Sequence, residues 1–241
     1  ILAGMNSHGI TTIKAPNLQR DHTELMLKYL KYPIKIQNKK NSKIIKIRGK
    51  QFLKVEKNYL VPGDPSSAAF LIVLALLSKN SNLSLPNVLL NPKRIGFLNV
   101  LKKMGGLIKI LNKKKQYGEM TGTIQVKSSL LRGVKINKKI IPNIIDEVPI
   151  LMIAASFANG ETFFPNLEEL KIKESDRLLA MENNLKKIGI KTKRISNDMT
   201  ILGASEEFYS NKIITIDSYK DHRIALSFAV MAMVSQKRIL I

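Results

Sequence analysis

Residues 162–188 read TFFPNLEELKIKESDRLLAMENNLKKI. The first part, Thr162 to Leu170, is composed like a strand, and the charged turn Lys173–Arg177 follows it. Leu185 and Ile188 then lie three residues apart with lysines between them, which is typical of a half-buried helix. The stretch therefore predicts a strand, a charged loop and an amphipathic helix in succession.

The same succession occurs twice more, upstream. In each copy a Pro-Asn pair follows a short β-like run, and it begins at Pro16, Pro86 and Pro165. An arginine comes next in each copy, namely Arg20, Arg94 and Arg177. An amphipathic helix follows, and it contains Leu27–Leu30, Leu101–Met104 and Leu185–Ile188. After the first two helices, alternating Lys and Ile residues indicate a strand with one solvated face.

A strongly apolar helix that begins with an acidic residue is the other recurring feature. Asp64, Asp146 and Asp221 open the runs 68–77, 148–158 and 224–234. The sequence Asp-Pro-Ser-Ser, which begins at Asp64, is typical of the N-terminus of a helix. Asp64 is therefore interpreted as a helix cap rather than a catalyst.

These repeats predict the fold class. A unit of about 75 residues is longer than the common solenoid repeats, which run about 20–50 residues. A few copies of a βαβαββ module in layered domains fit better, so we expect an α/β (α+β) protein.

The turn Lys173–Arg177 places two cations and two carboxylates together. A helix start offers unpaired backbone N–H groups and a favourable helix dipole, and both attract anions. A carboxylate such as Glu174, placed among cations and a bound anion, is suited to proton transfer. The alternative is a capping turn on a solvated helix, because Glu and Asp are common in first turns. Arg94 can likewise be interpreted simply as a solvated cation in a loop.

At this point the residues resemble a known family. The matching strings are Val61–Ser67, Asn143–Pro149, Leu167–Leu178 and Asp221–Ala225, preceded by the opening Gly9 to Thr23. In this order they closely resemble the 5-enolpyruvylshikimate-3-phosphate synthases, over essentially the whole chain. The resemblance implies the enolpyruvyl transferase fold, with two domains that are incomplete here. Residues 1–57 would end the first-formed domain, and residues 58–241 would make most of the second.

The resemblance also implies an activity and a site. The enolpyruvyl group of phosphoenolpyruvate would be transferred to the 5-hydroxyl of shikimate 3-phosphate, with release of phosphate, in aromatic amino acid biosynthesis. Asp146 and Glu174 would be the catalytic proton carriers. The residues expected to bind substrate are Lys173, Arg177, His222, Arg223 and Arg20. No cofactor and no metal are expected.

Some family segments are missing from the chain. The family carries a Gly-Ser-Lys-Ser-type segment and a Ser-Ala-Gln-type turn before the matched region, and another active-site lysine after it. None of these occurs in the 241 residues. We therefore expect an internal fragment of a longer enzyme, inactive by itself.

Two other functions stay open. The enolpyruvyl transferase that acts on UDP-N-acetylglucosamine shares the repeat fold, and its reactive Cys would lie outside this chain. The net charge of +22 also allows a basic nucleic-acid-binding protein. Against the second, the lysines are scattered, and few aromatic residues are available for base stacking.

Composition completes the expectations. The apolar runs are shorter than the roughly 18 residues that a membrane span needs. The chain has no Cys, which fits a reducing cytoplasm. We expect a cytoplasmic monomer whose partners are small-molecule substrates, with no specific nucleic acid and no membrane.

Overall fold

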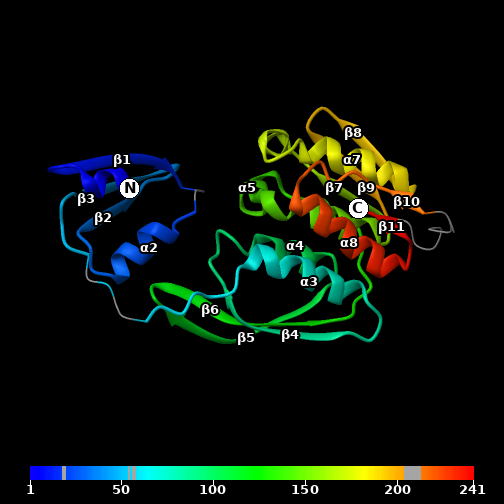
Figure 1. Ribbon diagram of the computed structural model, residues 1–241, viewed down its shortest axis with the longest axis horizontal. Coiled ribbons are helices and arrows are strands. Elements are labelled where there is room, and N and C mark those ends of the chain that lie inside the picture. Colours follow the sequence, from blue (N-terminus) through cyan, green and yellow to red (C-terminus); the bar gives the residue numbers. More distant parts are fainter. Residues whose placement is uncertain (18–19, 54, 56–57, 204–212) are drawn as a thin grey trace.

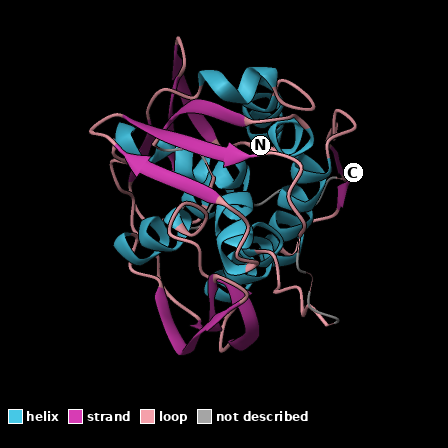
Figure 2. Cartoon of the chain, turned by 90° about the vertical axis from the view of Figure 1, so that its left-hand side faces the viewer, coloured by secondary structure: helices cyan, strands magenta, loops and turns pink. Residues whose placement is uncertain are grey.

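The computed structural model describes residues 1–17, 20–53, 55, 58–203 and 213–241 (Figure 1). Residues 1–48, here called the N-terminal body, form a small sheet with two helices. The remaining elements begin at residue 63 and are here called the main body. Figure 2 views the chain from the side of the N-terminal body, whose strands lie in front of the helices of the main body.

The N-terminal body has a core of its own. Its antiparallel sheet has the order β1-β3-β2, with β1 (Ile10–Pro16), β2 (Ile34–Asn38) and β3 (Ser42–Arg48). Its two helices are α1 (Leu2–Asn6) and α2 (His22–Tyr29). The buried side chains are Leu27, Tyr32, Ile34, Ile45 and Ile47.

The main body repeats this sheet twice. The first copy has the order β4-β6-β5, with β4 (Asn82–Leu89), β5 (Leu107–Gln116) and β6 (Glu119–Lys127). The second has the order β7-β9-β8, with β7 (Glu161–Phe164), β8 (Lys191–Ile195) and β9 (Asp198–Leu202). Helices α4 (Gly96–Lys103) and α7 (Arg177–Ile188) follow β4 and β7, as α2 follows β1. The predicted repeat is confirmed.

Three apolar helices pack on one another at the centre of the main body (Figure 1). They are α3 (Pro65–Leu77), α6 (Val148–Ser156) and α8 (His222–Ser235). Each of the nine residues of α6 is buried. An apolar helix has to bury its side chains, and the packed faces of these three helices contribute much of the core of the main body.

Short elements complete the chain. They are η1 (Lys138–Ile140), α5 (Ile141–Ile144), η2 (Ile145–Glu147), η3 (Glu168–Ile172), and the parallel pair β10 (Ile214–Thr215) and β11 (Ile239–Leu240).

The prediction of a strand from Thr162 to Leu170 is wrong for the second half of that stretch. Strand β7 ends at Phe164, and η3 begins at Glu168. Pro165 has no N–H for the sheet, and Asn166 adopts a left-handed φ of 54°, so the extended run stops there. The equivalent pair Pro86-Asn87 instead lies inside β4, at an irregularity in the register.

Two glycines allow equivalent close contacts. A Cβ on Gly203, after β9, would lie 1.8 Å from the carbonyl oxygen of Ala158, just beyond α6. A Cβ on Gly49, after β3, would lie 1.8 Å from the carbonyl oxygen of Ser7, just beyond α1. The end of the sheet therefore meets the end of a helix backbone to backbone in both copies.

Among the described residues, no helix is both long and apolar enough to span a membrane. The domain boundary expected after residue 57 lies outside the described residues, since 56 and 57 are not described.

Candidate active site

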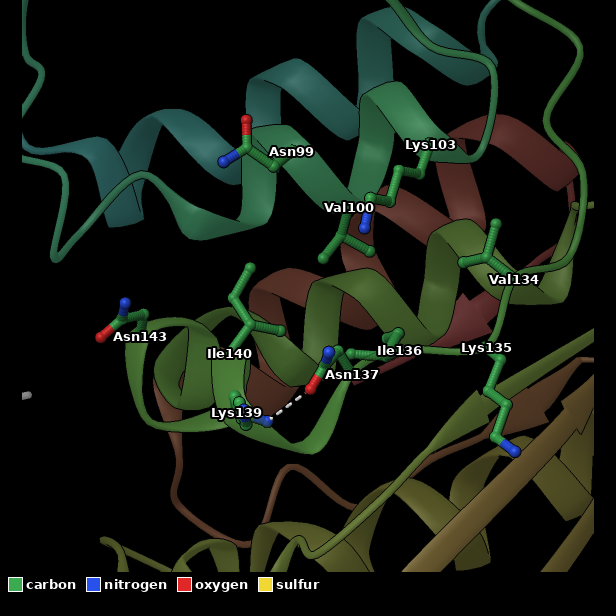
Figure 3. Close-up of a pocket in the computed structure, with 10 residues that line it drawn as sticks. All are labelled: Asn99, Val100, Lys103, Val134, Lys135, Ile136, Asn137, Lys139, Ile140 and Asn143. Atoms are coloured by element: carbon green, nitrogen blue, oxygen red, sulfur yellow. Dashed lines mark hydrogen bonds between the residues drawn. The ribbon is translucent and has the colours of Figure 1, made fainter.

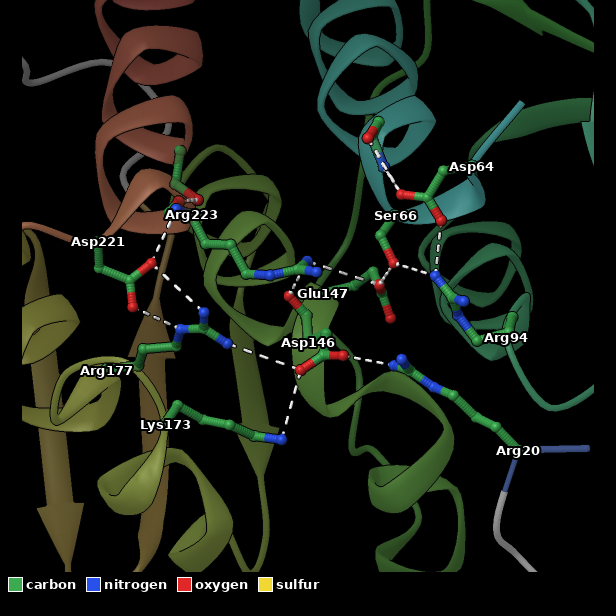
Figure 4. A network of polar contacts seen from close by, with 12 residues as sticks. Arg20, Asp64, Ser66, Arg94, Asp146, Glu147, Lys173, Arg177, Asp221 and Arg223 are labelled. Atoms are coloured by element: carbon green, nitrogen blue, oxygen red, sulfur yellow. Dashed lines mark hydrogen bonds and ion pairs between the residues drawn. The ribbon is translucent and has the colours of Figure 1, made fainter. Parts of the chain in front are cut away.

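The starts of α6, α7 and α8 lie close together and carry most of the predicted site residues (Figure 4). Asp146 lies in η2 directly before α6, Arg177 is the first residue of α7, and Arg223 is in the first turn of α8. Arg20 reaches the same place from the N-terminal body. Helix starts attract anions, so this arrangement concentrates positive potential at one point.

Asp146 is at the centre of the predicted residues. Arg20 donates a hydrogen bond to its Oδ2. Nζ of Lys173 lies 3.5 Å and Nη1 of Arg177 lies 3.6 Å from its Oδ1. The side chain is 13% exposed, so it can still be reached from solvent.

These cations keep Asp146 ionised. Burial raises the pKa of the carboxyl, but the hydrogen bond from Arg20 and the charges of Arg223 and Lys173 act in the other direction. The net pKa lies below its ordinary value. Asp146 is therefore a carboxylate whose basicity depends on how strongly its cations remain engaged with it.

Arg177 is locked in place by Asp221. The Arg177 side chain is only 1% exposed, and its Nε donates to Oδ2 of Asp221 over 2.7 Å. Ser175 Oγ donates to the same oxygen at 3.1 Å. The other oxygen accepts the backbone N–H of Arg223 at 2.9 Å and so caps α8. One carboxylate thus ties the start of α7 to the start of α8.

Arg223 contacts the backbone of Asp146 rather than its carboxylate (Figure 4). Its Nη1 donates to the backbone carbonyl of Asp146 at 2.8 Å. The same nitrogen lies 3.8 Å from Oε1 of Glu147. The structure therefore brings together Asp146, Lys173, Arg177, Arg223 and Arg20, five of the seven predicted residues.

The other two predicted residues lie at the edge. Glu174 contacts Arg177 and is 55% exposed. His222 is exposed at the first position of α8. Lys173 also pairs with Glu169, with Nζ 2.6 Å from Oε1.

Sequence reasoning missed a second group behind the first. Glu147 is 2% exposed and accepts a hydrogen bond from Ser66 Oγ. Nη2 of Arg94 lies 2.8 Å from the same Ser66 oxygen and 2.6 Å from Asp64. The interpretation of Arg94 as a solvated cation is wrong, because its side chain is 13% exposed. The position of Arg94 in the repeat, equivalent to Arg177, was the signal that could have found it.

Asp64 caps α3, as predicted. Its carboxylate accepts the backbone N–H of Ser67 at 2.9 Å. Asp176 caps α7 in the same way through Leu179. At the start of α6, by contrast, no side chain caps the helix, so Asp146 and Glu147 keep their carboxylates for other partners.

Figure 3 shows a separate hollow of about 280 Å³ between α4 and residues 134–143. Its walls combine apolar side chains such as Val100 and Ile140 with Lys103. None of the predicted site residues lines it. It is therefore distinct from the charged network of Figure 4.

Comparison with known families gives one match over the whole chain. Residues 1–241 match the family model described as EPSP synthase (3-phosphoshikimate 1-carboxyvinyltransferase). The chain is 47% identical over 233 residues to the 3-phosphoshikimate 1-carboxyvinyltransferase of Clostridium tetani, covering 97% of this chain and 51% of that protein. The chain is also 42% identical to the protein of the same name from Caldicellulosiruptor bescii, over 96% of this chain and 52% of that protein.

Solved structures agree with this match. The EPSP synthase of Acinetobacter baumannii superposes with a TM-score of 0.85 at 34% identity, covering 99% of this chain and 52% of that one. The enolpyruvyl transferase NikO of Streptomyces tendae shares the fold, with a TM-score of 0.63, 17% identity and coverage of 97% and 51%. The chain spans about half the length of the curated relatives it matches.

Proposed function

Because the chain belongs to the EPSP synthase (3-phosphoshikimate 1-carboxyvinyltransferase) family, we propose that it forms part of an enzyme with that activity. The enzyme transfers the enolpyruvyl group of phosphoenolpyruvate to the 5-hydroxyl of shikimate 3-phosphate and releases phosphate. The observation that carries the proposal is the position of the Asp146 carboxylate among Arg20, Lys173 and Arg177.

The cations match the charge of the substrates. Phosphoenolpyruvate carries a phosphate and a carboxylate, and shikimate 3-phosphate carries the same two kinds of anion. Arg177 and Arg223 hold the phosphoenolpyruvate anions, Arg20 binds the phosphate of the second substrate, and Lys173 lies between them. Planar guanidinium groups pair with such oxyanions through two parallel hydrogen bonds.

The reaction is an addition followed by an elimination. The 5-hydroxyl oxygen bonds to the enol carbon while the methylene carbon gains a proton and becomes a methyl group. The hydroxyl proton leaves to a base. The adduct then loses phosphate together with a methyl proton, which restores the double bond. Asp146 accepts the hydroxyl proton, and Glu174 delivers and removes the proton at carbon.

The Asp146 carboxylate becomes a stronger base when substrates bind. In the structure Arg20 and Lys173 lower the pKa of Asp146. When these cations turn to the substrate anions, their hold on the carboxylate weakens, and its proton affinity rises. Substrate binding therefore itself raises the basicity of Asp146, so proton abstraction takes place only when the substrates are bound.

The organisation and surroundings of the protein form part of the proposal. We infer domains of residues 1–57 and 58–241, an inference supported by the separate core of the N-terminal body. We also infer a cytoplasmic monomer that acts on small molecules. Scattered lysines on the outer faces of helices, such as Lys102 on α4 and Lys186 on α7, favour general solubility over a nucleic-acid surface.

The test is product analysis, with the protein that carries this chain at the full length of its relatives. Phosphoenolpyruvate and shikimate 3-phosphate should release phosphate and give the enolpyruvyl ether, identified by mass. UDP-N-acetylglucosamine serves as the competing acceptor. Turnover with the amino sugar alone would select the other transferase, and turnover with neither acceptor would remove the proposed activity.

A further inference from the structure

Glu147 is a buried carboxylate that the proposed reaction does not use. It ends η2, directly after Asp146, and its side chain is 2% exposed. An ionised carboxylate is costly to bury unless cations and hydrogen bonds compensate for the lost water. Its charge is therefore set by the groups packed around it.

Groups from four segments face this carboxylate (Figure 4). Ser66 of α3 donates a hydrogen bond to Oε1. Arg94, which precedes α4, donates a hydrogen bond to the same Ser66 hydroxyl, so its positive charge lies close to the Glu147 carboxylate. Arg223 of α8 lies 3.8 Å away, and Asp146 of η2 adds a like charge.

These groups act in opposite directions. Burial raises the pKa of Glu147, and the charge of Asp146 raises it further. The Ser66 hydrogen bond and the charges of Arg223 and Arg94 lower it, but the net pKa stays above its ordinary value. Glu147 can therefore change its charge under milder conditions than an exposed glutamate.

Arg223 is where that change has an effect. Its Nη1 donates a hydrogen bond to the Asp146 carbonyl and lies 3.8 Å from Oε1 of Glu147. Under the proposed function, on which this inference rests, the same guanidinium must also bind a substrate anion. An ionised Glu147 competes with that anion for the charge of Arg223, whereas a protonated Glu147 does not.

We propose that Glu147 is a titratable counter-ion of Arg223, which sets how strongly this arginine binds the phosphate or carboxylate of phosphoenolpyruvate. Glu147 touches no reacting atom in this scheme. It is a positioning residue that acts through Arg223, with Ser66 stabilising its ionised form.

The first test is Glu147→Gln in the full-length protein. Glutamine keeps the size of the side chain and an oxygen for the Ser66 hydrogen bond, but it removes the charge. The KM for phosphoenolpyruvate should fall at neutral pH, on the order of tenfold, because Arg223 loses its competing anion. The KM for shikimate 3-phosphate should not change. A damaged site weakens binding, so a tighter KM cannot come from misfolding.

The second test is the pH profile of that KM. In the parent protein affinity for phosphoenolpyruvate should rise as pH falls and Glu147 gains its proton, beyond the titration of the substrate itself. Glu147→Gln should abolish this additional dependence. Ser66→Ala removes the hydrogen bond to the ionised form, so the midpoint should move to higher pH.

Two control variants match the tested ones in chemistry, one beside Ser66 on α3 and one on α7. Ser67→Ala removes the neighbouring hydroxyl, which bonds to Asp64 instead. Glu182→Gln removes a carboxylate that pairs with Lys186 and Arg194 on α7 and β8. Both variants should keep the parent KM and the parent pH profile.

The outcomes separate this inference from the proposed function. If the parent turns over and Glu147→Gln binds phosphoenolpyruvate no more tightly, with the parent pH profile, the counter-ion role is wrong. If Glu147→Gln does not fold, an unmoved midpoint in Ser66→Ala refutes it equally. If the parent shows no enolpyruvyl transfer, the function fails alone, and calorimetric binding of inorganic phosphate to parent and Glu147→Gln still decides the role of Glu147.

Discussion

Asp146 differs from the three aspartates that cap helices α3, α7 and α8 in what its carboxylate contacts. Asp64, Asp176 and Asp221 each accept a backbone N–H and cap a helix. Asp146 instead contacts side-chain cations and remains partly exposed. A carboxylate that is not needed to hold a helix end can exchange a proton without loss of structure, which suits Asp146 to a role as a base.

The two proposed catalytic carboxylates, Asp146 and Glu174, can be told apart by isotope exchange. Asp146→Asn and Glu174→Gln keep the shape of each side chain, so each variant should still bind shikimate 3-phosphate. Because each loses a proton carrier, kcat should fall by about 10²–10⁴. If Glu174 serves the carbon, Glu174→Gln should suppress deuterium entry into the phosphoenolpyruvate methylene more strongly than Asp146→Asn does.

The order of these two variants is the informative result. The opposite order would mean that the carboxylates have exchanged roles. Full activity in either variant would exclude that residue from the mechanism. Glu168→Gln, a change in an exposed acid of η3, serves as the control and should leave both kcat and exchange unchanged.

Asp221 should make the fold sensitive to acid. Burial raises its pKa, but Arg177 and the N–H of Arg223 lower it below 3.8 overall. A depressed carboxylate pKa stabilises the fold above the unfolded value, and this contribution is lost as pH falls through the folded value. Asp221→Asn should cost about 3–5 kcal/mol at pH 7, because Arg177 loses its buried partner.

Urea unfolding followed by circular dichroism measures this effect. The difference in unfolding free energy between parent and Asp221→Asn should stay constant from pH 7 to the ordinary aspartate pKa and shrink as pH falls below it. A difference that stayed constant with pH would show that the Asp221 charge does not stabilise the fold. The pH dependence of stability that Glu147 contributes has the opposite sign, because its pKa is raised by folding. Its contribution to the free energy of unfolding is present below the ordinary glutamate pKa of 4.5 and is lost as pH rises through the folded pKa.

At the scale of elements, the sequence predicted what local pattern determines. The apolar runs of α3, α6 and α8 and the Lys-spaced apolar residues of α4 and α7 predicted the helices correctly. Strand β7 was predicted too long because Leu167 and Leu170 extend the apolar pattern, although Asn166 turns the chain before them. The charged motifs contained five residues that the structure brings together. Glu147 and Ser66 were missed because their contact joins positions 81 residues apart.

Gly203 tests the packing that repeats between the modules. In Gly203→Ala the new Cβ would lie 1.8 Å from the Ala158 carbonyl oxygen, so backbone must move. We expect a loss of about 1–3 kcal/mol in unfolding free energy. Gly63→Ala is the control, because its Cβ would meet nothing closer than 3.5 Å. Equal stability of the two variants in thermal or urea unfolding would contradict the close contact between the sheet end and the helix end.

At the scale of the whole molecule, the site depends on contacts between the two bodies. Arg20 meets Asp146, and the next two residues also reach the main body. Asp21 pairs with Lys93 at 3.0 Å, and His22 bonds to Glu119 at 2.5 Å. A motif of three consecutive residues therefore joins the N-terminal body to the main body beside the site. No local sequence pattern specifies such pairings, so the sequence did not predict them.

The net charge of +22 raises the question of whether anions bind a built site or only a basic surface. Arg177 and Arg223 are mostly buried and held by carboxylates, with side chains 1% and 15% exposed. Lys102 and Lys186 are exposed on the amphipathic helices α4 and α7. These two pairs separate a specific site from diffuse attraction.

The most direct measurement is the calorimetric affinity of the full-length protein for phosphoenolpyruvate in the presence of shikimate 3-phosphate. Arg177→Ala and Arg223→Ala should each weaken binding by about 1.5–3 kcal/mol, because each removes a charge-assisted hydrogen bond. Lys102→Ala and Lys186→Ala should leave the affinity unchanged. Equal losses in all four variants would mean that diffuse charge, and not the cluster around Asp146, binds the substrate.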